Sequence, residues 1–310
     1  MLTATLRIVR GNLGFICIPL VLIGIATSRL PAQTTAQRAT VDTSQCDLID
    51  SDRPGLADGS HVIGAGQIQL ETGYQQERHR DEGVVSHLSF APTLLRLGLS
   101  SRVEARVESN AYDRARVSAA NGSATTTGGF APVFLGVKVV LYDPKQVGPL
   151  QVATIVRIAP PSGTDGFKSD RATADIRAVA DWQFTPRLSL NPNVGYGAYE
   201  GSDGTLVKTA LGALTLTWQP APRWNPFVDV AYGSREDAGG TWAMIGDAGV
   251  AYILGCNLQL DLSAGQSLHG VTAPKPFVAA GISVRADLLH RSTHPLDYPH
   301  GDRPAQPARI

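Results

Sequence analysis

The chain has 310 residues and carries 27 basic and 27 acidic side chains, a balance that argues against a nucleic-acid partner. This length is enough for one large domain or two ordinary ones, and the charge balance identifies no ligand class. A mean hydropathy near zero and a low aromatic content do not exclude a membrane protein, provided that its strands are apolar on one side only.

The amino terminus has the order of features of a secretory signal. Arg7 and Arg10 are followed by an apolar run at 15–25 and then by small residues up to Ala32. This order predicts a signal peptide over residues 1–32 and a mature protein outside the cytoplasm. An uncleaved membrane helix is the alternative, but the apolar run has only about half of the ~20 residues that such a helix needs.

Residues 33–65 are polar and irregular, with a dense cluster of charged and turn-forming residues at 50–55. We expect this segment to be a periplasmic leader. Because the cluster lies directly before the first strand, it could also fold into the mouth of the domain that follows, as a partial plug. The simpler interpretation is a capped turn that tethers a leader.

The stretch at 66–78 alternates apolar and polar side chains too regularly for a helix. The two faces are Ile68, Leu70, Thr72 and Tyr74 against Gln67, Gln69, Glu71 and Gln75. Glutamines and a carboxylate on one face indicate a strand with an apolar medium on one side and water on the other.

Eleven further segments repeat this pattern to the end of the chain. They are, by residue number, 84–97, 103–108, 133–141, 152–158, 175–184, 188–196, 208–218, 226–233, 244–254, 258–267 and 277–288. We expect Pro92 at a bulge, which leaves the direction of Arg96 open, and we expect Pro192 to cost its strand one hydrogen bond. The polar stretches at 113–129 and 163–170 are expected to be loops.

Short and long links between these segments alternate. Short links lie near Leu99, Pro144, Pro186, Ala221 and Cys256, and mostly longer ones near Gly122, Gly166, Ser202, Asp237 and Val271. Aromatic residues gather toward both ends: Tyr142, Trp182, Phe184, Trp218 and Trp224 at the short links, and Tyr74, Tyr196, Tyr199, Tyr232 and Trp242 at the long ones. Both features are typical of an outer-membrane barrel, whose short turns face the periplasm.

The sequence therefore predicts an all-β, antiparallel outer-membrane β-barrel of about 12 strands over residues 66–288, with a Pro- and His-rich tail at 289–310. Closure is required because unpaired strand edges find no water in a bilayer. A secreted or surface β-protein with a structural or binding role and no transport activity is the alternative. As a sandwich it would bury charges such as Glu104, Arg106 and Asp175, or expose Leu and Val instead.

Five short motifs carry a family resemblance. They are Asp-Arg-Pro at 52–54 before the strand at 66–74, Leu-Arg-Leu-Gly-Leu at 95–99 with Val-Glu at 103–104, Gly-Val-Lys at 136–138, Ala-Pro-Pro-Ser-Gly at 159–163, and Leu-Gly-Cys-Asn-Leu-Gln-Leu-Asp at 254–261. Together they resemble the MetA-pathway phenol-degradation family of transporter-like outer-membrane proteins. The resemblance implies a barrel that takes up aromatic compounds, and it supplies no catalytic residues.

The resemblance also implies partners. These are outer-membrane lipid, a small-molecule solute and the barrel assembly machinery during insertion. Barrels of this kind usually end on an aromatic residue that the machinery recognises, whereas this chain continues to Ile310.

The side chains expected to face inward carry charges of both signs. They are Glu71, Glu104, Arg106, Glu108, Lys138, Arg157, Asp175, Arg177, Asp181, Asp229, Asp247, Asp261 and Arg285. Two interpretations stay open. Either the charges line a narrow polar pathway that steers a small solute, or they pair across strands and fill a barrel of moderate diameter.

Of three cysteines, Cys17 lies in the predicted signal, so Cys46 and Cys256 remain in the mature chain. Both fall on the predicted periplasmic side, where a disulfide between them would attach the leader to a short link. Two free thiols are the alternative. Neither cysteine has a Cys or His neighbour at metal-ligand spacing, and we expect no metal and no cofactor.

An enzymatic barrel is a further alternative. Ser86, His87 and Ser89 offer the residue types of a hydrolase, but adjacent strand residues face opposite sides and no Gly-x-Ser-x-Gly motif is present. The tail histidines have prolines between them and no carboxylate cage, which indicates a solvated extension. We therefore expect a non-enzymatic channel for the passive passage of small hydrophobic or aromatic compounds, the solute following from the resemblance alone.

Overall fold

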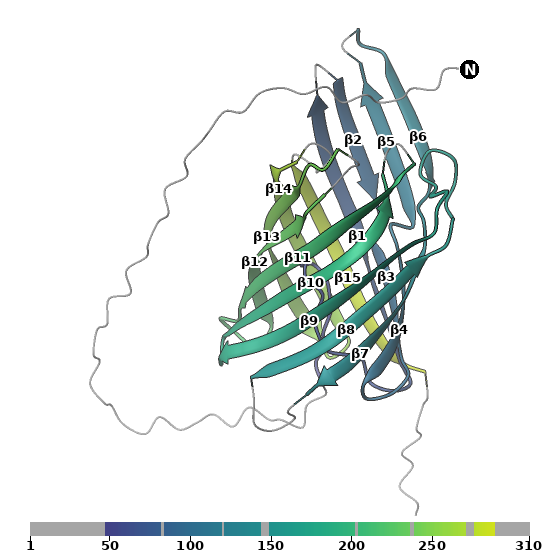
Figure 1. The fold of residues 1–310 in the computed structure, drawn as a ribbon. Helices are drawn as coiled ribbons and strands as arrows, with labels where there is room; N and C mark the ends of the chain where they lie inside the picture. The colour runs from purple at the N-terminus through teal and green to yellow at the C-terminus, as the bar shows by residue number, and fades with distance from the viewer. Residues whose placement is uncertain are drawn as a thin grey trace, which may run out of the picture.

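The computed structural model describes residues 47–81, 84–119, 121–143, 149–201, 204–235, 239–270 and 276–288. In this part of the chain it has fifteen β-strands (Figure 1). They are β1 (Gln67–Asp81), β2 (Val84–Phe90), β3 (Thr93–Gly98), β4 (Val103–Ser109), β5 (Tyr112–Ser118), β6 (Ala124–Phe130), β7 (Phe134–Tyr142), β8 (Leu150–Ala159), β9 (Thr173–Thr185), β10 (Leu188–Glu200), β11 (Leu206–Trp218), β12 (Trp224–Gly233), β13 (Ala243–Gly255), β14 (Leu258–His269) and β15 (Phe277–Asp287). None of the described residues belongs to a helix long and apolar enough to cross a membrane.

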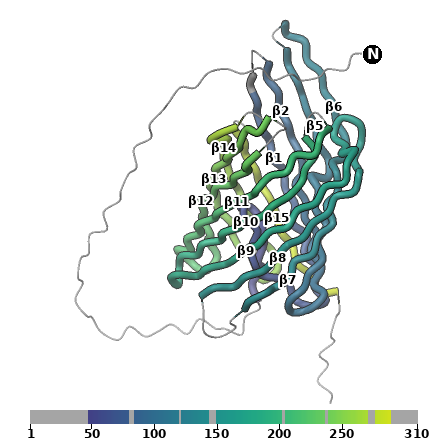
Figure 2. The backbone as a smooth tube through the Cα atoms, in the orientation of Figure 1, coloured from purple at the N-terminus to yellow at the C-terminus, as the bar shows by residue number. Residues whose placement is uncertain are grey.

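Twelve of these strands form one closed antiparallel ring. Its order is β1, β3, β4 and then β7 to β15 in sequence, and β15 pairs with β1 to close it. The closing ladder runs from Gln67 opposite Asp287 to Glu77 opposite Phe277 without a register shift. Figure 2 shows the strands inclined to the axis of the ring, as barrel closure requires. The prediction of an all-β antiparallel barrel of about 12 strands is confirmed.

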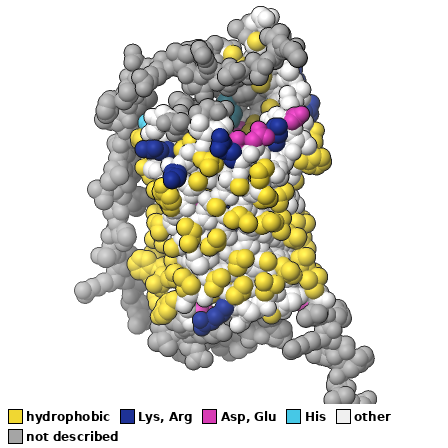
Figure 3. Space-filling model, turned by 45° about the vertical axis from the view of Figure 1, so that its right-hand side comes forward, with side chains coloured by type: hydrophobic (Ala, Val, Ile, Leu, Met, Phe, Trp, Pro, Cys, Tyr) yellow, Lys and Arg dark blue, Asp and Glu magenta, His cyan; other side chains and the backbone are white. Residues whose placement is uncertain are grey.

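Alternation along the strands puts apolar side chains outside and charges inside. Leu70, Val137 and Ile176 are exposed, whereas the strand neighbours Glu71 and Lys138 are fully buried. On the face drawn in Figure 3, the exposed apolar side chains form a broad band, with charged side chains above and below it. A soluble sandwich would have the opposite arrangement, so the band and the closed ring exclude it.

Aromatic side chains border this band. Nine of the ten aromatic residues expected at the strand ends are exposed, among them Trp182 and Trp218 toward one rim and Tyr74 and Tyr232 toward the other. The exception is Tyr199, which is half-buried and whose hydroxyl is buried, because its position in β10 faces inward. The two girdles therefore form as expected, without Tyr199.

The prediction of a loop at 113–129 is wrong. β5 and β6 form a hairpin there, with Arg116 opposite Thr126. The strand expected at 84–97 is likewise divided at Ala91 and Pro92 into β2 and β3. The upper part of β1 pairs with β2, β2 with β5, and β5 with β6, which gives a four-stranded sheet that rises beyond the ring (Figure 1). This extension sheet has polar residues on both faces, so its composition resembles that of a loop.

The remaining expected strands agree with β4 and with β7 to β15 apart from a few terminal residues. Pro192 does lie within a strand. It is opposite Leu214 of β11, while the ladder between β10 and β9 skips Asn191 and Pro192. The ring thus tolerates the missing amide by an interruption on one side of one strand.

Candidate channel interior

The thirteen residues expected to face inward all lie on the interior face of the ring. Nine are less than a tenth exposed, namely Glu71, Glu104, Arg106, Lys138, Asp175, Asp229, Asp247, Asp261 and Arg285. The other four, Glu108, Arg157, Arg177 and Asp181, are partly buried. Most of these charges are joined to an opposite charge or to one stretch of irregular backbone.

That stretch is residues 47–65, the lumen segment, which runs through the interior of the ring before β1 begins. Arg285 of β15 donates from Nη2 to the Asp47 carbonyl at 2.5 Å. The Ile63 amide donates to Glu104 of β4 at 3.0 Å. The segment therefore has partners on both sides of the closing ladder. Residues 33–46, the rest of the predicted leader, lie outside the described residues.

Asp52 is the acidic centre of the lumen segment. Its carboxylate accepts hydrogen bonds from Lys138 Nζ at 2.9 Å, from Arg106 Nη1 at 2.5 Å and from the Gly59 amide at 2.9 Å. Burial by itself raises the pKa of Asp52, but Lys138, Arg96 and Arg106 together hold it well below its usual range. The carboxylate therefore stays ionised and links β3, β4 and β7 to the segment.

Arg96 of β3, whose direction the sequence left open, points inward and is 1% exposed. Its guanidinium donates to Glu104 at 3.0 Å and to Glu71 at 3.0 Å. It also donates to the backbone carbonyls of Asp50 at 3.1 Å and His61 at 2.9 Å. One side chain thus binds two strands and both arms of the lumen segment.

Asp58 and Ser60 attach the second half of the segment to other strands. The Asp58 carboxylate accepts from Arg106 Nη2 and Arg177 Nη1, each at 2.9 Å. Asn193 of β10 exchanges two hydrogen bonds with the Asp58 backbone, at 2.8 and 2.9 Å. The Ser60 hydroxyl donates to Asp181 at 2.5 Å. The segment is therefore bound on the β9 and β10 side as well.

His61 lies beside two carboxylates. Its Nδ1 is 3.0 Å from Asp181 Oδ2 and 3.2 Å from Asp50 Oδ2. The hydrogen bond with Asp181, supported by the charge of Asp50, raises the pKa of His61 from 6.5 to about 9 despite the opposing effect of burial. His61 is therefore charged at neutral pH and adds an ion pair between the segment and β9.

Arg53 reaches the strands that close the ring. Its guanidinium binds Asp261 of β14 through Nη2 at 3.0 Å and Nε at 3.3 Å. It lies over Gly73 and Gly281, which face each other across the β1–β15 ladder. A Cβ at Gly281 would be 2.4 Å from Arg53 Nε, so glycine is needed there to admit the guanidinium.

Asp229 of β12 and Asp247 of β13 lie directly opposite each other. Asp229 accepts from the Leu56 amide at 2.6 Å and from Thr215 at 3.2 Å. One oxygen of each carboxylate is buried without a hydrogen-bond partner among the described residues. Within the described ranges, no group of three or more His, Cys, Asp or Glu residues is placed to hold a metal ion.

Two cavities lie on opposite sides of the lumen segment. The outer cavity has a volume of about 390 Å³ and lies toward the extension sheet. The inner cavity, also about 390 Å³, is lined by the segment itself and by residues toward the opposite rim, such as Gln219 and Asn225. Arg53 lines both, so the segment separates them.

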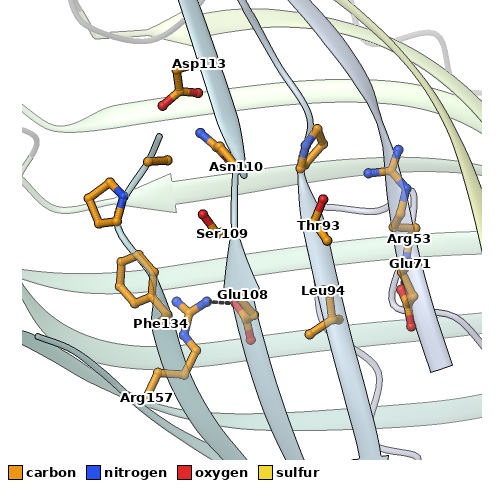
Figure 4. A pocket seen from close by; sticks show the side chains of 13 residues that line it. Arg53, Glu71, Thr93, Leu94, Glu108, Ser109, Asn110, Asp113, Phe134 and Arg157 are labelled. Atoms are coloured by element: carbon orange, nitrogen blue, oxygen red, sulfur yellow. Dashed lines mark hydrogen bonds and ion pairs between the residues drawn. The ribbon is translucent and has the colours of Figure 1, made fainter. Parts of the chain in front are cut away.

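The outer cavity lies where β3, β4 and β7 give way to the extension sheet (Figure 4). Its apolar lining includes Leu94 and Phe134, and its polar lining includes Glu108 and Arg157. Arg157 forms an ion pair with Glu108, and its guanidinium carbon lies 5.3 Å from the centre of the Phe134 ring. The cavity thus offers an aromatic face, a cation and hydrogen-bonding groups together.

Sequence reasoning missed Arg96 and the charged residues of the lumen segment. If the alternation is restarted after Pro92, the Leu-Arg-Leu at 95–97 places Arg96 on the inner face of its strand. The acids and bases at 50–61 were visible as a cluster, but no local pattern names their partners, which lie up to 208 residues away in the case of Arg53 and Asp261.

The predicted disulfide involves one described residue. Cys256 forms a disulfide bond, and Cys46 lies outside the described residues, so the pairing stays a prediction. The signal at 1–32 and the tail at 289–310 are also outside them. The serine and histidine considered for a hydrolase lie in β2, where Ser86 is opposite His79 of β1 and His87 is opposite Arg78 of β1.

The closed twelve-stranded ring, its apolar outer band and its charged interior define an outer-membrane β-barrel. A family model described as "Putative MetA-pathway of phenol degradation" matches residues 51–286, and the chain belongs to this family. The resemblance carried by the short motifs is confirmed.

One of the similar solved structures supports the fold. The COG4313 outer membrane channel from Pseudomonas putida F1 is similar, with a TM-score of 0.55, 12% identity, and coverage of 73% of this chain and 98% of that chain. This chain is less similar to the NanC porin, with a TM-score of 0.42, 9% identity, and coverage of 72% of this chain and 100% of that chain. It is also less similar to the Ralstonia pickettii toluene transporter TbuX, with a TM-score of 0.38, 10% identity, and coverage of 73% of this chain and 90% of that chain. A search of curated protein sequences finds no match. The predicted location in the outer membrane is confirmed.

Proposed function

We propose that this protein is a non-enzymatic channel for the passive passage of small hydrophobic or aromatic compounds across the outer membrane. The outer cavity carries the proposal, because Phe134 and Leu94 offer apolar contact beside the cation of Arg157. An apolar cavity of about 150 Å³ holds benzene. A volume of about 390 Å³ therefore suits an aromatic ring with a polar substituent.

The lumen segment is, in this proposal, a plug that controls passage below the outer cavity. Its support is the set of ion pairs that Asp52, Asp58 and His61 make with the barrel wall. The interior charges thus serve first to bind the segment, and a solute path opens when the segment shifts. Membrane lipid and a small solute are then the partners, besides the assembly machinery that inserts barrels.

The experiment compares uptake of a labelled phenol-sized aromatic by cells with and without the protein. Phe134→Ala should lower uptake severalfold, because it removes the aromatic wall of the outer cavity. The matched control is Phe130→Ala, since Phe130 is 60% exposed on the outside of β6. The proposed route would be refuted if cells with and without the protein took up the aromatic equally. It would also be refuted if Phe130→Ala lowered uptake as much as Phe134→Ala.

A further inference from the structure

The extension sheet carries a row of cations on its outer face. Arg78 of β1 is opposite His87 of β2, and His87 is opposite Arg116 of β5. Arg114 lies two residues along β5 and so shares the same face. All three arginines are exposed. Exposed Tyr74 occupies the same face of β1 four residues earlier, so this face continues the lipid-facing surface of the barrel.

No described carboxylate shares this face. The residues beside the row are Gln76, Ser89, Thr126 and Gly128. The described acids of the sheet, Glu77 and Asp113, alternate to the other face and are buried. Among the described residues, no ion pair is formed by Arg78, Arg114 or Arg116. Within the described part of the sheet, the three arginines therefore have no counter-charge on their face.

The height of the row above the membrane is set by aromatic side chains. Tyr74, Tyr112 and Phe130 are exposed immediately below it, and the Tyr112 and Phe130 rings meet edge to face with centres 5.6 Å apart. Such aromatics mark the boundary between the hydrocarbon and the headgroups. The arginine row thus lies at the level of the outer-leaflet headgroups, which are phosphorylated sugars in an outer membrane.

Spacing and chemistry both suit phosphate. Neighbouring strands are about 4.8 Å apart and alternate residues of a strand about 7 Å apart, so the three arginine positions span roughly 10 to 12 Å on the sheet. Each guanidinium binds phosphate through two parallel hydrogen bonds, which makes arginine suited to this ligand. A headgroup with more than one phosphate can engage several of them at once.

We propose that Arg78, Arg114 and Arg116, with His87 between them, dock the phosphorylated headgroup of an outer-leaflet glycolipid. The lipid lies against the outer face of the extension sheet and attaches the sheet to the membrane surface. This attachment supports a sheet that has only β1 in common with the ring.

The test uses the full-length protein purified from outer membranes in mild detergent, with lipid binding measured by native mass spectrometry. The probes are lipid A with two phosphates, the same lipid after phosphatase treatment, and inorganic phosphate. The variant is Arg78→Gln, Arg114→Gln and Arg116→Gln combined. The matched control changes Arg102, Arg187 and Arg223, three exposed arginines at the opposite rim, to glutamine.

The wild type and the control should bind the bisphosphorylated lipid, and the triple variant should bind it about 100-fold more weakly, at about fivefold per arginine. Removing the phosphates from the lipid should have a similar effect on the wild type. Undiminished binding by the triple variant would overturn the proposal, as would equal binding of the dephosphorylated lipid. Competition by inorganic phosphate at matched concentration would also overturn it, because the site would then recognise free phosphate. Heat-dependent gel mobility verifies that each variant is folded.

Discussion

Arg96 is buried between the carboxylates of Glu104 and Glu71, so loss of its charge would leave both acids without their principal counter-ion. We expect Arg96→Met to lower the free energy of unfolding by about 3–5 kcal/mol, as when a buried ion pair loses one partner. This change in the free energy of unfolding is measured by urea titration, with gel mobility as the probe of unfolding. Arg102→Met, at an exposed rim position, should change stability by less than about 0.5 kcal/mol. Equal midpoints for the two variants would show that Arg96 is not structural.

His61 gives the lumen segment a pH-dependent attachment. Its pKa rises from 6.5 to about 9 beside Asp181 and Asp50, while Lys138 acts in the opposite direction. Because this pKa is raised, protonated His61 makes its full contribution to the attachment of the lumen segment below pH 6.5. That contribution is lost as the pH rises through about 9. Channel openings in planar bilayers should therefore become more frequent over this range. His61→Gln should remove the dependence, and an unchanged pH profile in that variant would contradict the role of His61.

At the scale of elements, the lumen segment and the ring depend on each other, since Asp52 joins β3, β4 and β7 within the interior. We expect deletion of residues 33–60 to raise single-channel conductance severalfold, because an interior that holds the segment would then hold water. The control replaces residues 112–118 with a Gly/Ser linker of equal length, which alters the extension sheet but leaves the segment in place. Unchanged conductance after the deletion would eliminate the plug.

At the scale of the whole molecule, the contact between β1 and β15 turns a sheet into a barrel. Thr72 and Ile282 lie opposite each other in this ladder, at a separation that suits a disulfide in an antiparallel pair. Thr72→Cys with Ile282→Cys should therefore cross-link on oxidation and change mobility on a denaturing gel. Thr72→Cys with Val278→Cys is the control, because Val278 is opposite Gln76 instead. Cross-linking of both pairs to the same extent would mean that the ring has no fixed register.

The period of two along each strand was enough to predict the barrel, its girdles and the thirteen inward residues. This pattern is local, since Leu70 and Glu71 are neighbours in sequence and the two media select opposite faces. The same rule failed at 113–129, because β5 and β6 carry polar residues on both faces and so lack a regular apolar–polar alternation. It also failed at Arg96, because Pro92 interrupts the count.

The sequence by itself determined the strand content, the membrane-facing surface and the family of this protein, all of which depend on short-range patterns. Only the tertiary structure decided what the interior charges bind. Asp52 and Lys138 are 86 residues apart, and their ion pair exists only because ring closure surrounds the lumen segment with wall residues. Local patterning sets the side of the strand on which a charge lies, but long-range topology sets its partner.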